Sequence, residues 1–223
     1  QDFYRITAQN FSQTRNHPWP GWEKLFSYLT PDQPFSVLDV GCGNGRFGQF
    51  LSENLDSQIN YTGLDANPTF LDHARQLLST IVSSISLIQQ DIIQYPPDSG
   101  QYDLVVLFGV IHHIPGHQNR QNFMRQLAQR VALDGLLVFA SWRFYDEPRF
   151  RDRIIPWPDN FQVEAHDYLL DWRSGENALR YCHFVDDAEH TDLITATGLT
   201  ELATYRADGK SGHLNQYSIL RCD

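Results

Sequence analysis

The chain has 223 residues, 41% of them hydrophobic, which is the size of one large α/β domain with a substantial core. Its 17 Lys and Arg against 27 Asp and Glu leave a formal net charge of −10, which argues against a protein that coats nucleic-acid phosphate with its whole surface. No apolar run approaches the ~20 residues that cross a bilayer and the first residues do not resemble a secretory signal, so we expect a cytoplasmic protein without a membrane partner.

Helix-period and strand-type segments alternate along the chain, and this alternation is typical of a parallel sheet covered by helices on both faces. Residues 2–30 are expected to form a helical N-terminal lid, interrupted at 17–21 because two prolines and a glycine cannot remain in one helix. The expected strands are 36–40, 60–65, 85–90, 103–108, 136–142, 179–185, 199–206 and 213–221. The expected helices are 46–54, 68–80, one that starts near 118, and one between 186 and 198.

Two segments of the second half interrupt or close this alternation. Residues 143–178 are rich in Pro, Trp, Arg and Asp without clear periodicity, and we expect them to form an insertion over the functional site. Residues 207–212 are short and turn-rich, so the two strands that they join are expected to be antiparallel neighbours. The sequence therefore predicts one doubly wound α/β domain over 1–223, with the lid at 1–30 and the insertion at 143–178.

The most informative stretch is Gly41-Cys42-Gly43-Asn44-Gly45, which follows a buried strand and precedes a helix. Alternate glycines let the backbone turn tightly and let a ligand approach the main-chain N–H groups. The spacing G-x-G-x-G, with Asp39 two residues before the first glycine, departs from the pyrophosphate-binding G-x-G-x-x-G. It resembles motif I of the class I S-adenosylmethionine (AdoMet) methyltransferases.

This resemblance implies a Rossmann-like, seven-stranded and mainly parallel sheet with an antiparallel last strand, AdoMet as methyl donor and S-adenosylhomocysteine as product. Asp39, Asp65 and Asp91 are spaced 26 residues apart, as expected for successive strand ends that one ligand touches, although each Asp alone also fits a strand end or helix cap. In the family, the first acid serves the methionine end, the second the ribose and the third the adenine. The cofactor-binding residues so implied are Trp19, Asp39, Gly41, Cys42, Gly43, Gly45, Asp65, Ala66, Asp91, Ile92, Phe108 and His113.

The histidines at 112, 113 and 117 invite a metal interpretation. Adjacent histidines point apart on a helix or strand, and the sequence shows no converging carboxylate or thiol set, since its three cysteines are scattered without a CxxC pair. We therefore expect no metal site. The segment Ile111-His112-His113-Ile114 resembles the loop after the fourth strand in many AdoMet methyltransferases, which implies that His113 covers the cofactor; a loop histidine satisfied by the backbone is the alternative.

Two regions, 11–20 and 167–172 followed by 180–184, resemble one subfamily, the tRNA wobble-uridine carboxymethyl methyltransferases. That subfamily esterifies a carboxymethyl group on uridine, and its eukaryotic members work with a small zinc-binding activator protein. A carboxylate is ionised at neutral pH, so esterification needs orientation by cations and no general base. Carried over by position, the resemblance implies the catalytic residues Arg15, Arg180, Tyr181 and His183, with Trp19 beside the acceptor.

The predicted function is AdoMet-dependent methyl transfer to a carboxylate of a carboxymethyl-modified uridine in tRNA. The basic run Arg143, Arg149, Arg151 and Arg153 is either an RNA contact or a solvated face. A methyltransferase for a small-molecule carboxyl, hydroxyl or amine is the enzymatic alternative, which the acidic charge favours. A non-catalytic AdoMet-fold module that binds a partner protein is the alternative from another class.

Overall fold

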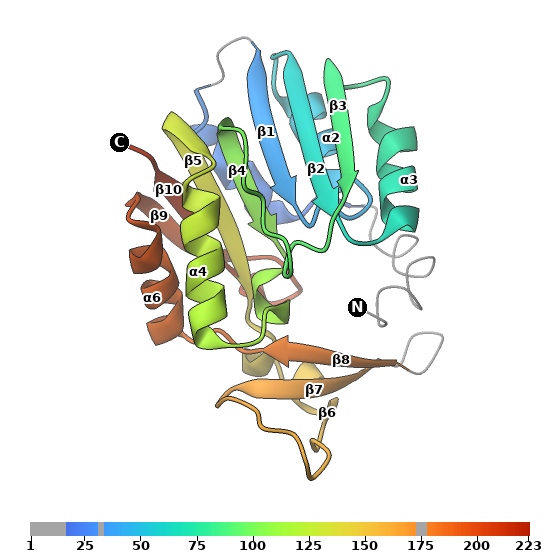
Figure 1. Cartoon of the computed structure of the whole chain (residues 1–223), viewed down its shortest axis with the longest axis vertical. Coiled ribbons are helices and arrows are strands. Elements are labelled where there is room, and N and C mark those ends of the chain that lie inside the picture. Colours follow the sequence, from blue (N-terminus) through green and yellow to red (C-terminus); the bar gives the residue numbers. More distant parts are fainter. Residues whose placement is uncertain (1–16, 31–33, 173–177) are drawn as a thin grey trace.

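The computed structural model describes residues 17–30, 34–172 and 178–223. Its main sheet has seven strands in the order β3-β2-β1-β4-β5-β10-β9 (Figure 1). These strands are β1 (Phe35–Val40), β2 (Ile59–Asp65), β3 (Ser84–Gln89), β4 (Tyr102–Phe108), β5 (Val131–Trp142), β9 (Thr200–Ala207) and β10 (Asn215–Arg221). The helices around it are η1 (Pro20–Ser27), α2 (Arg46–Asn54), α3 (Pro68–Leu78), α4 (His117–Ala128) and α6 (Asp187–Thr197).

The strand directions confirm the predicted topology. The pairs β3–β2, β2–β1, β1–β4 and β4–β5 are parallel, whereas β10 is antiparallel to both β5 and β9. The parallel strands therefore end at one edge of the sheet, which lies toward the bottom of Figure 1. In this class of fold, a ligand binds at that edge, where the strand order changes direction between β1 and β4.

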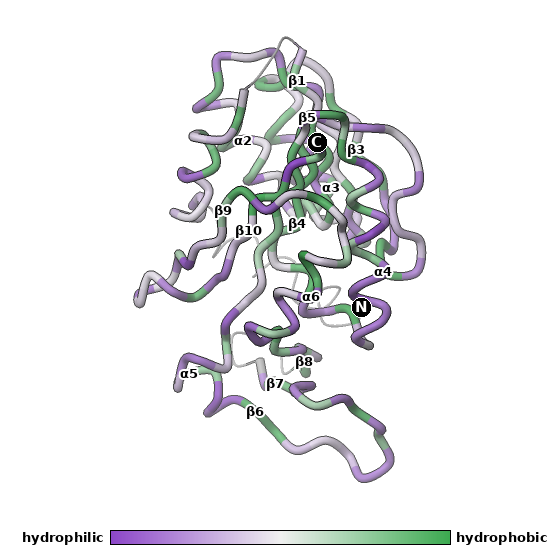
Figure 2. The backbone as a smooth tube through the Cα atoms, turned by 90° about the vertical axis from the view of Figure 1, so that its left-hand side faces the viewer, coloured by the Kyte–Doolittle hydropathy of each residue, from purple (hydrophilic) through white to green (hydrophobic). Residues whose placement is uncertain are grey.

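Both faces of the sheet are buried, because successive apolar side chains of its central strands point to opposite faces. Leu104 and Val106 of β4 belong to the core that includes side chains of η1 and α2, while Val105 and Leu107 belong to the core under α4 and α6. Figure 2 shows hydrophobic residues gathered along these central strands. None of the helices in the described part of the chain combines the length and apolar character that a membrane span requires.

The fifth strand is longer than its predicted range. It begins at Val131, and the Asp134-Gly135 pair that was expected to form a turn before the strand is instead an irregularity inside it. Asp134 has a φ of 61°, and its backbone N–H donates to Cys222 O at 2.8 Å. Between its pairings with Tyr102 and Leu104 of β4, β5 advances from Val131 to Leu136, so it accommodates three extra residues without ending. The same local signal fits a turn and a bulge-like irregularity inside a strand.

A second, smaller sheet lies beyond the carboxyl ends of the parallel strands (Figure 1). Its antiparallel strands are β6 (Ile154–Ile155), β7 (Asp167–Trp172) and β8 (Ala178–His183), preceded by η3 (Phe144–Asp146) and α5 (Pro148–Arg151). The strand predicted over 179–185 is thus present as β8, but it pairs with β7 and not with the main sheet. A core of Phe144, Leu170, Cys182 and Phe184 joins η3 to this inserted sheet.

The N-terminal region is described from residue 17 onward, and the lid expected over 1–30 stays a prediction. Residues 1–16 lie outside the described part of the chain, so that the helix predicted from residue 2 is described only from its interruption onward. The interruption itself opens η1, with Pro20 in the first turn, where its missing N–H is not needed. Trp22 is 2% exposed and Gly21 N donates to the buried Asp208 Oδ1 at 2.8 Å, so this segment is part of the core.

Candidate functional site

The glycine loop turns sharply between β1 and α2. Gly41, Gly43 and Gly45 have φ angles of +79°, +54° and +82°, a region that residues with a β-carbon rarely adopt. A β-carbon on Gly41 would lie 2.4 Å from Val110 Cγ2, so this position also needs glycine for space. A β-carbon on Gly43 would have no heavy atom within 4 Å, which leaves the backbone of the loop open to a ligand at that residue.

Asp65 ends β2 and joins the loop directly. Its Oδ2 accepts a hydrogen bond from Gly43 N at 2.9 Å, and its Oδ1 accepts one from Asn67 N at 2.8 Å. Burial raises the pKa of this carboxyl above its ordinary value, and the backbone N–H groups oppose that rise. A carboxylate with two acceptor oxygens therefore lies beside the open face of the loop, with the exposed Ala66 following it.

Asp39 occupies a more enclosed position. Its side chain is 3% exposed, and Tyr61 OH donates to its Oδ2 at 2.5 Å. Burial raises the pKa of Asp39 to about 7; the Tyr61 hydrogen bond opposes this rise, the negative charge of Asp65 adds to it and Arg46 opposes it. The carboxyl thus changes its charge near neutral pH inside the fold, a property that the spacing of the three acids did not predict.

Two further predicted cofactor residues are Ile92, which follows β3 and lies near the loop, and Cys42, which is part of the loop. Ile92, which is 7% exposed, lies 3.8 Å from the point where a Gly41 β-carbon would be. Cys42 is buried, with its Sγ 2.9 Å from the corresponding point on Gly63. Asp91 Oδ1 accepts from Ile93 N at 3.2 Å and so caps the turn after β3, while its predicted contact with adenine stays a prediction.

Trp19 and Phe108 pack together next to this loop. Their ring centroids are 6.2 Å apart, and the half-buried Trp19 also stacks on Trp22 at 5.4 Å. A β-carbon on Gly109 would lie 3.4 Å from Trp19 Cη2, so the tryptophan covers the backbone just after β4. The structure thus brings together two aromatic residues that are 89 positions apart and that the family resemblance gave as cofactor-binding residues.

Arg180 of β8 reaches the ends of β4 and β5. Its guanidinium Nη2 lies 2.7 Å from His113 Nε2 and 3.4 Å from His112 Nε2, both in η2 (Ile111–His113) after β4. Its Cζ lies 4.9 Å from the ring centroid of Trp142, the last residue of β5. Arg180 is 8% exposed, so the inserted sheet places a buried cation at the carboxyl edge of the main sheet.

Tyr181 and His183 lie on the opposite face of β8. Tyr181 OH donates to Asp167 Oδ1 at 2.8 Å, which together with burial raises the pKa of this phenol. His183 Nδ1 lies 2.7 Å from Asp167 Oδ1. Neighbouring strand residues point to opposite faces, so Arg180 lies on one face of β8 and Tyr181 and His183 on the other. Arg15, the fourth predicted catalytic residue, lies outside the described residues.

The surroundings of His183 form a buried ionic network that the sequence analysis missed. His183 Nε2 lies 2.6 Å from Glu189 Oε2, and Arg120, 1% exposed, donates to Glu189 Oε1 at 2.6 Å and to Glu164 Oε2 at 2.9 Å. Burial alone would raise the pKa of Glu189, but the His183 hydrogen bond and the charges of Arg120 and His183 outweigh it and lower this pKa to about 2. The network joins α4 and α6 to the inserted sheet.

Asp186 and Glu189, three residues apart, give a sequence signal for this network, because their spacing is that of a capping box. Asp186 does cap α6, since its Oδ1 accepts from Glu189 N at 2.8 Å. The side chain of Glu189 instead turns toward Arg120 and His183. Beside it lies a hollow of about 300 Å³ lined by His117, Arg120, Glu164, Ala165, His166, His183, Asp186 and Glu189.

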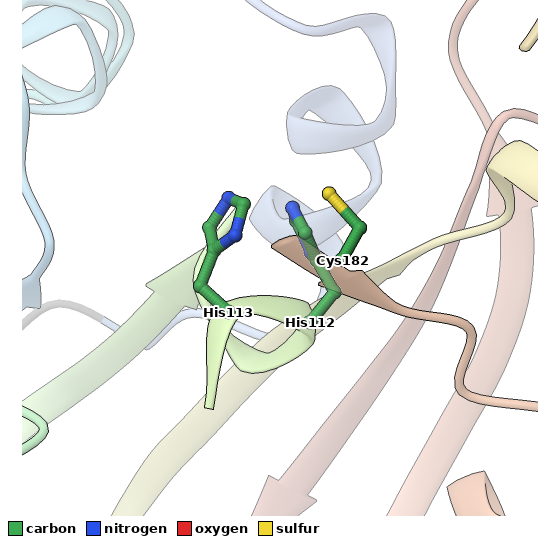
Figure 3. Close-up of side chains that lie close together, drawn as sticks. All are labelled: His112, His113 and Cys182. Carbon is green, nitrogen blue, oxygen red and sulfur yellow. The ribbon is translucent and has the colours of Figure 1, made fainter. Parts of the chain in front are cut away.

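Among the described residues, two separate sets of side chains are of the types that can bind a metal ion, and the members of each set lie close to one another. Figure 3 shows His112, His113 and Cys182, whose candidate ligand atoms are within 4.8 Å of one another, so a thiol does converge on the histidines, contrary to the sequence analysis. Burial raises the pKa of Cys182 to about 11, which disfavours the thiolate that metals bind, and Arg180 donates to His113 Nε2. The second set is Glu164, Asp167 and His183. Both ring nitrogens of His183 are already in hydrogen-bond contact, Nδ1 with Asp167 and Nε2 with Glu189.

The basic run after β5 is not one surface. Arg143 is 5% exposed, and its guanidinium contacts Asp146 Oδ2 at 2.9 Å and Val185 O at 2.9 Å, so it supports the inserted sheet from within. Arg149 and Arg151 are exposed on α5. The RNA contact therefore stays a prediction for Arg149, Arg151 and the half-buried Arg153, and it excludes Arg143, whose N–H donors are already bonded within the fold.

Comparison with known proteins gives a consistent result. Residues 38–137 match the family described as "Methyltransferase domain". The chain is 27% identical over 164 residues to the tRNA (carboxymethyluridine(34)-5-O)-methyltransferase of Saccharomyces cerevisiae, across 69% of this chain and 54% of that protein. It is 24% identical to the enzyme of the same description from Schizosaccharomyces pombe, across 87% of this chain and 86% of that protein.

The fold has close counterparts among solved structures. The N-methyltransferase NodS from Bradyrhizobium japonicum, in complex with S-adenosyl-L-homocysteine, superposes with a TM-score of 0.62 at 19% identity, covering 94% of this chain and 90% of that one. This likeness shows the seven-stranded fold, and the matched range 38–137 includes the glycine loop of this chain together with Asp39, Asp65 and Asp91. The fold, the matched domain and the relatives together indicate an S-adenosylmethionine-dependent methyltransferase similar to those of class I.

Proposed function

We propose that the chain transfers a methyl group from AdoMet to a carboxylate of a carboxymethyl-modified uridine in tRNA. The observation that carries this proposal is the buried Arg180 guanidinium at the carboxyl edge of the main sheet, on the same side as the glycine loop. A guanidinium binds a carboxylate through two parallel N–H donors and keeps its charge at any physiological pH. The two yeast relatives, which by their names methylate carboxymethyluridine, support the same acceptor.

The residues of the loop fit AdoMet. The backbone at Gly43 faces open space, so a ligand can approach the loop closely there, while the N–H of Gly43 holds the Asp65 carboxylate beside it. Backbone N–H groups of Gly43, Asn67 and Ala66 donate to the Asp65 carboxylate, whose two oxygens have about four acceptor sites, so it can also accept from a ribose hydroxyl. Asp39 and the loop then serve the methionine end, and Asp91 with Ile92 the adenine, as the family resemblance implies.

The proposed reaction needs no general base from the protein. AdoMet supplies an electrophilic methyl group on a sulfonium. The acceptor carboxylate, with an ordinary pKa of about 4, is ionised at neutral pH and needs no base. Arg180 fixes its orientation, and the Trp19–Phe108 pair covers the loop and keeps water from the reacting atoms.

A labelling experiment tests this proposal. Bulk tRNA is incubated with AdoMet that carries a labelled methyl group, with the chain alone and with a small zinc-binding activator protein of the kind that eukaryotic members of the subfamily use. We expect label in tRNA that is released by mild base, as an ester is. Arg180→Met is expected to lower kcat/KM roughly 100-fold, because a charged hydrogen-bond pair is lost.

The matched control is Arg125→Met, which removes an exposed arginine from α4 and is expected to keep wild-type activity. Binding of S-adenosylhomocysteine, measured by calorimetry, is expected to be unchanged in both variants. Label that resists base would exclude the ester. If tRNA takes up no label while AdoMet is consumed with a small carboxylic acid, the acceptor is a small molecule, a reading that the net charge of −10 favours.

A further inference from the structure

We propose that His113 is a positioning residue for Arg180: as a neutral imidazole it holds the guanidinium in place for the acceptor carboxylate. This inference rests on the proposed function and deepens it. The resemblance to other methyltransferases assigned His113 to the cofactor. The contacts of its ring instead connect it to β8, the strand that carries Arg180.

The two ring nitrogens have different partners, and each partner allows one role only. Nδ1 lies 3.0 Å from Tyr181 O, and a carbonyl oxygen can only accept, so Nδ1 carries the proton. Nε2 lies 2.7 Å from Arg180 Nη2, and a guanidinium can only donate, so Nε2 is the acceptor. The neutral tautomer with its proton on Nδ1 is therefore the one form that satisfies both contacts.

The other neighbours of the guanidinium leave it little freedom. Arg180 Cζ lies over the Trp142 ring at 4.9 Å, and the rings of His112 and His113 are 4.2 Å apart. Since Trp142 ends β5 and the histidines follow β4, these contacts fix the cation to the main sheet. An ordered guanidinium binds a carboxylate without losing further side-chain entropy, so the acceptor is held more tightly and in one orientation.

Protonation of His113 would reverse the contact. An Nε2–H would face the Arg180 donor at 2.7 Å, and two positive charges at that distance repel. Within the described part of the chain, the charged and titratable side chains placed beside His113 include Arg180 and Cys182 from β8 and His112 from η2. Lowering the pH is therefore expected to raise the KM for the tRNA acceptor, whose carboxylate stays ionised above a pH of about 5.

Two substitutions of similar size separate the two ring contacts. Gln reaches about as far as Nε2, so His113→Gln retains an acceptor oxygen for Arg180. Asn reaches about as far as Nδ1, so His113→Asn retains the Tyr181 contact and loses the one to Arg180. We expect His113→Asn to raise the KM for bulk tRNA roughly tenfold and His113→Gln to stay within about threefold of the wild type. His213→Gln, at an exposed histidine, is the control.

The pH profile gives a readout that a purely structural role would not move. Between pH 6 and 8, at saturating AdoMet, the acceptor KM is expected to depend on pH more strongly in the wild type than in His113→Gln. The pH dependence of Asp39 is common to both proteins and cancels in this comparison. Equal profiles, or a His113→Asn variant that binds tRNA as His113→Gln does, would overturn the inference, provided that thermal unfolding shows both variants folded.

The tautomer is measured independently of activity. Nitrogen-15 NMR of the histidine rings, with the His113 signal assigned by its loss in His113→Gln, is expected to show a neutral ring protonated on Nδ1. A ring protonated on Nε2 would refute the inference. If the NMR result holds while the wild type labels no tRNA, the proposed function has failed and the ring contacts stand.

Discussion

At the glycine loop, three residues with positive φ and one carboxylate make the same short stretch of backbone both tight and accessible. Gly41 is required for space against Val110, whereas Gly43 leaves the loop open where Asp65 binds its N–H. Asp65 thus holds the loop, and in the proposed function it also accepts from the ligand. A substitution at this residue is expected to act on affinity before it acts on the fold, because Asn keeps one acceptor oxygen.

Asp65→Asn is expected to weaken binding of S-adenosylhomocysteine roughly 10- to 100-fold, since a hydrogen bond to a charged group contributes about 1.5–3 kcal/mol. Isothermal titration calorimetry measures the change. Asp72→Asn on the exposed face of α3 serves as the control and is expected to bind as the wild type does. Unchanged affinity in Asp65→Asn would mean that this carboxylate does not contact the cofactor.

At the scale of elements, the inserted sheet is placed by one polar network and one small core. Arg120 of α4 and Glu189 of α6 meet His183 of β8, and Arg143 ties η3 to the chain after β8. Buried ions without partners are costly, so every member of such a network depends on the others. Because β8 carries Arg180 on its other face, the network also fixes the position of the proposed acceptor contact.

Glu189→Gln is expected to lower the free energy of unfolding at pH 7 by about 1–3 kcal/mol, since it removes the charge that pairs with Arg120 and His183. Glu189 has its pKa lowered to about 2, so its contribution is fully present above its ordinary pKa of 4.5 and is lost as the pH falls toward 2. Urea unfolding of both proteins between pH 3 and 7 tests this: the difference should shrink below pH 4.5.

Glu53→Gln, at an exposed position of α2, is the control, and its unfolding difference from the wild type is expected to be small at every pH. Differences for Glu189→Gln that stayed constant from pH 7 to pH 3 would show that the charge of Glu189 does not stabilise the fold. The wild type alone would not resolve this effect, because Asp39, with its pKa raised to about 7, makes stability fall as the pH rises from about 4 to 7.

At the scale of the whole molecule, the protein has a net charge of −10 and the proposed substrate, tRNA, is also negatively charged. Long-range repulsion slows such an encounter, so binding depends on local cations such as Arg149 and Arg151 on α5 and on any activator protein. Local phosphate contacts release counterions and make affinity fall with salt. A small acid bound by Arg180 alone lacks this counterion release.

The salt dependence of the acceptor KM is therefore expected to identify the acceptor class. For tRNA, the KM should rise at least severalfold between about 50 and 200 mM KCl, and Arg149→Gln with Arg151→Gln should reduce the slope. Methylation kinetics at fixed, saturating AdoMet provide the measurement. Indifference to salt would favour a small-molecule acceptor, with the KM for AdoMet as the internal reference.

The sequence predicted the elements of the main sheet almost residue by residue, because each is encoded locally. Helix α2 was predicted over 46–54 and found at Arg46–Asn54, and the glycine loop before it has the backbone that its spacing required. Errors arose where one local signal fits two structures. Asp134-Gly135 signals a turn and also a bulge, and the segment 179–185 signals a strand without naming its partner.

The sequence by itself predicted a site for the methyl donor from a strand, three glycines and acids at regular intervals. Each of these features is recognised from residues close to it in the chain. The tertiary structure alone decided which side chains meet across the fold. It separated Arg180 from Tyr181 and His183, because adjacent strand residues face opposite ways, and it raised the pKa of Asp39 through burial. It also gave His113 a partner 67 positions away, which no spacing along the chain could indicate.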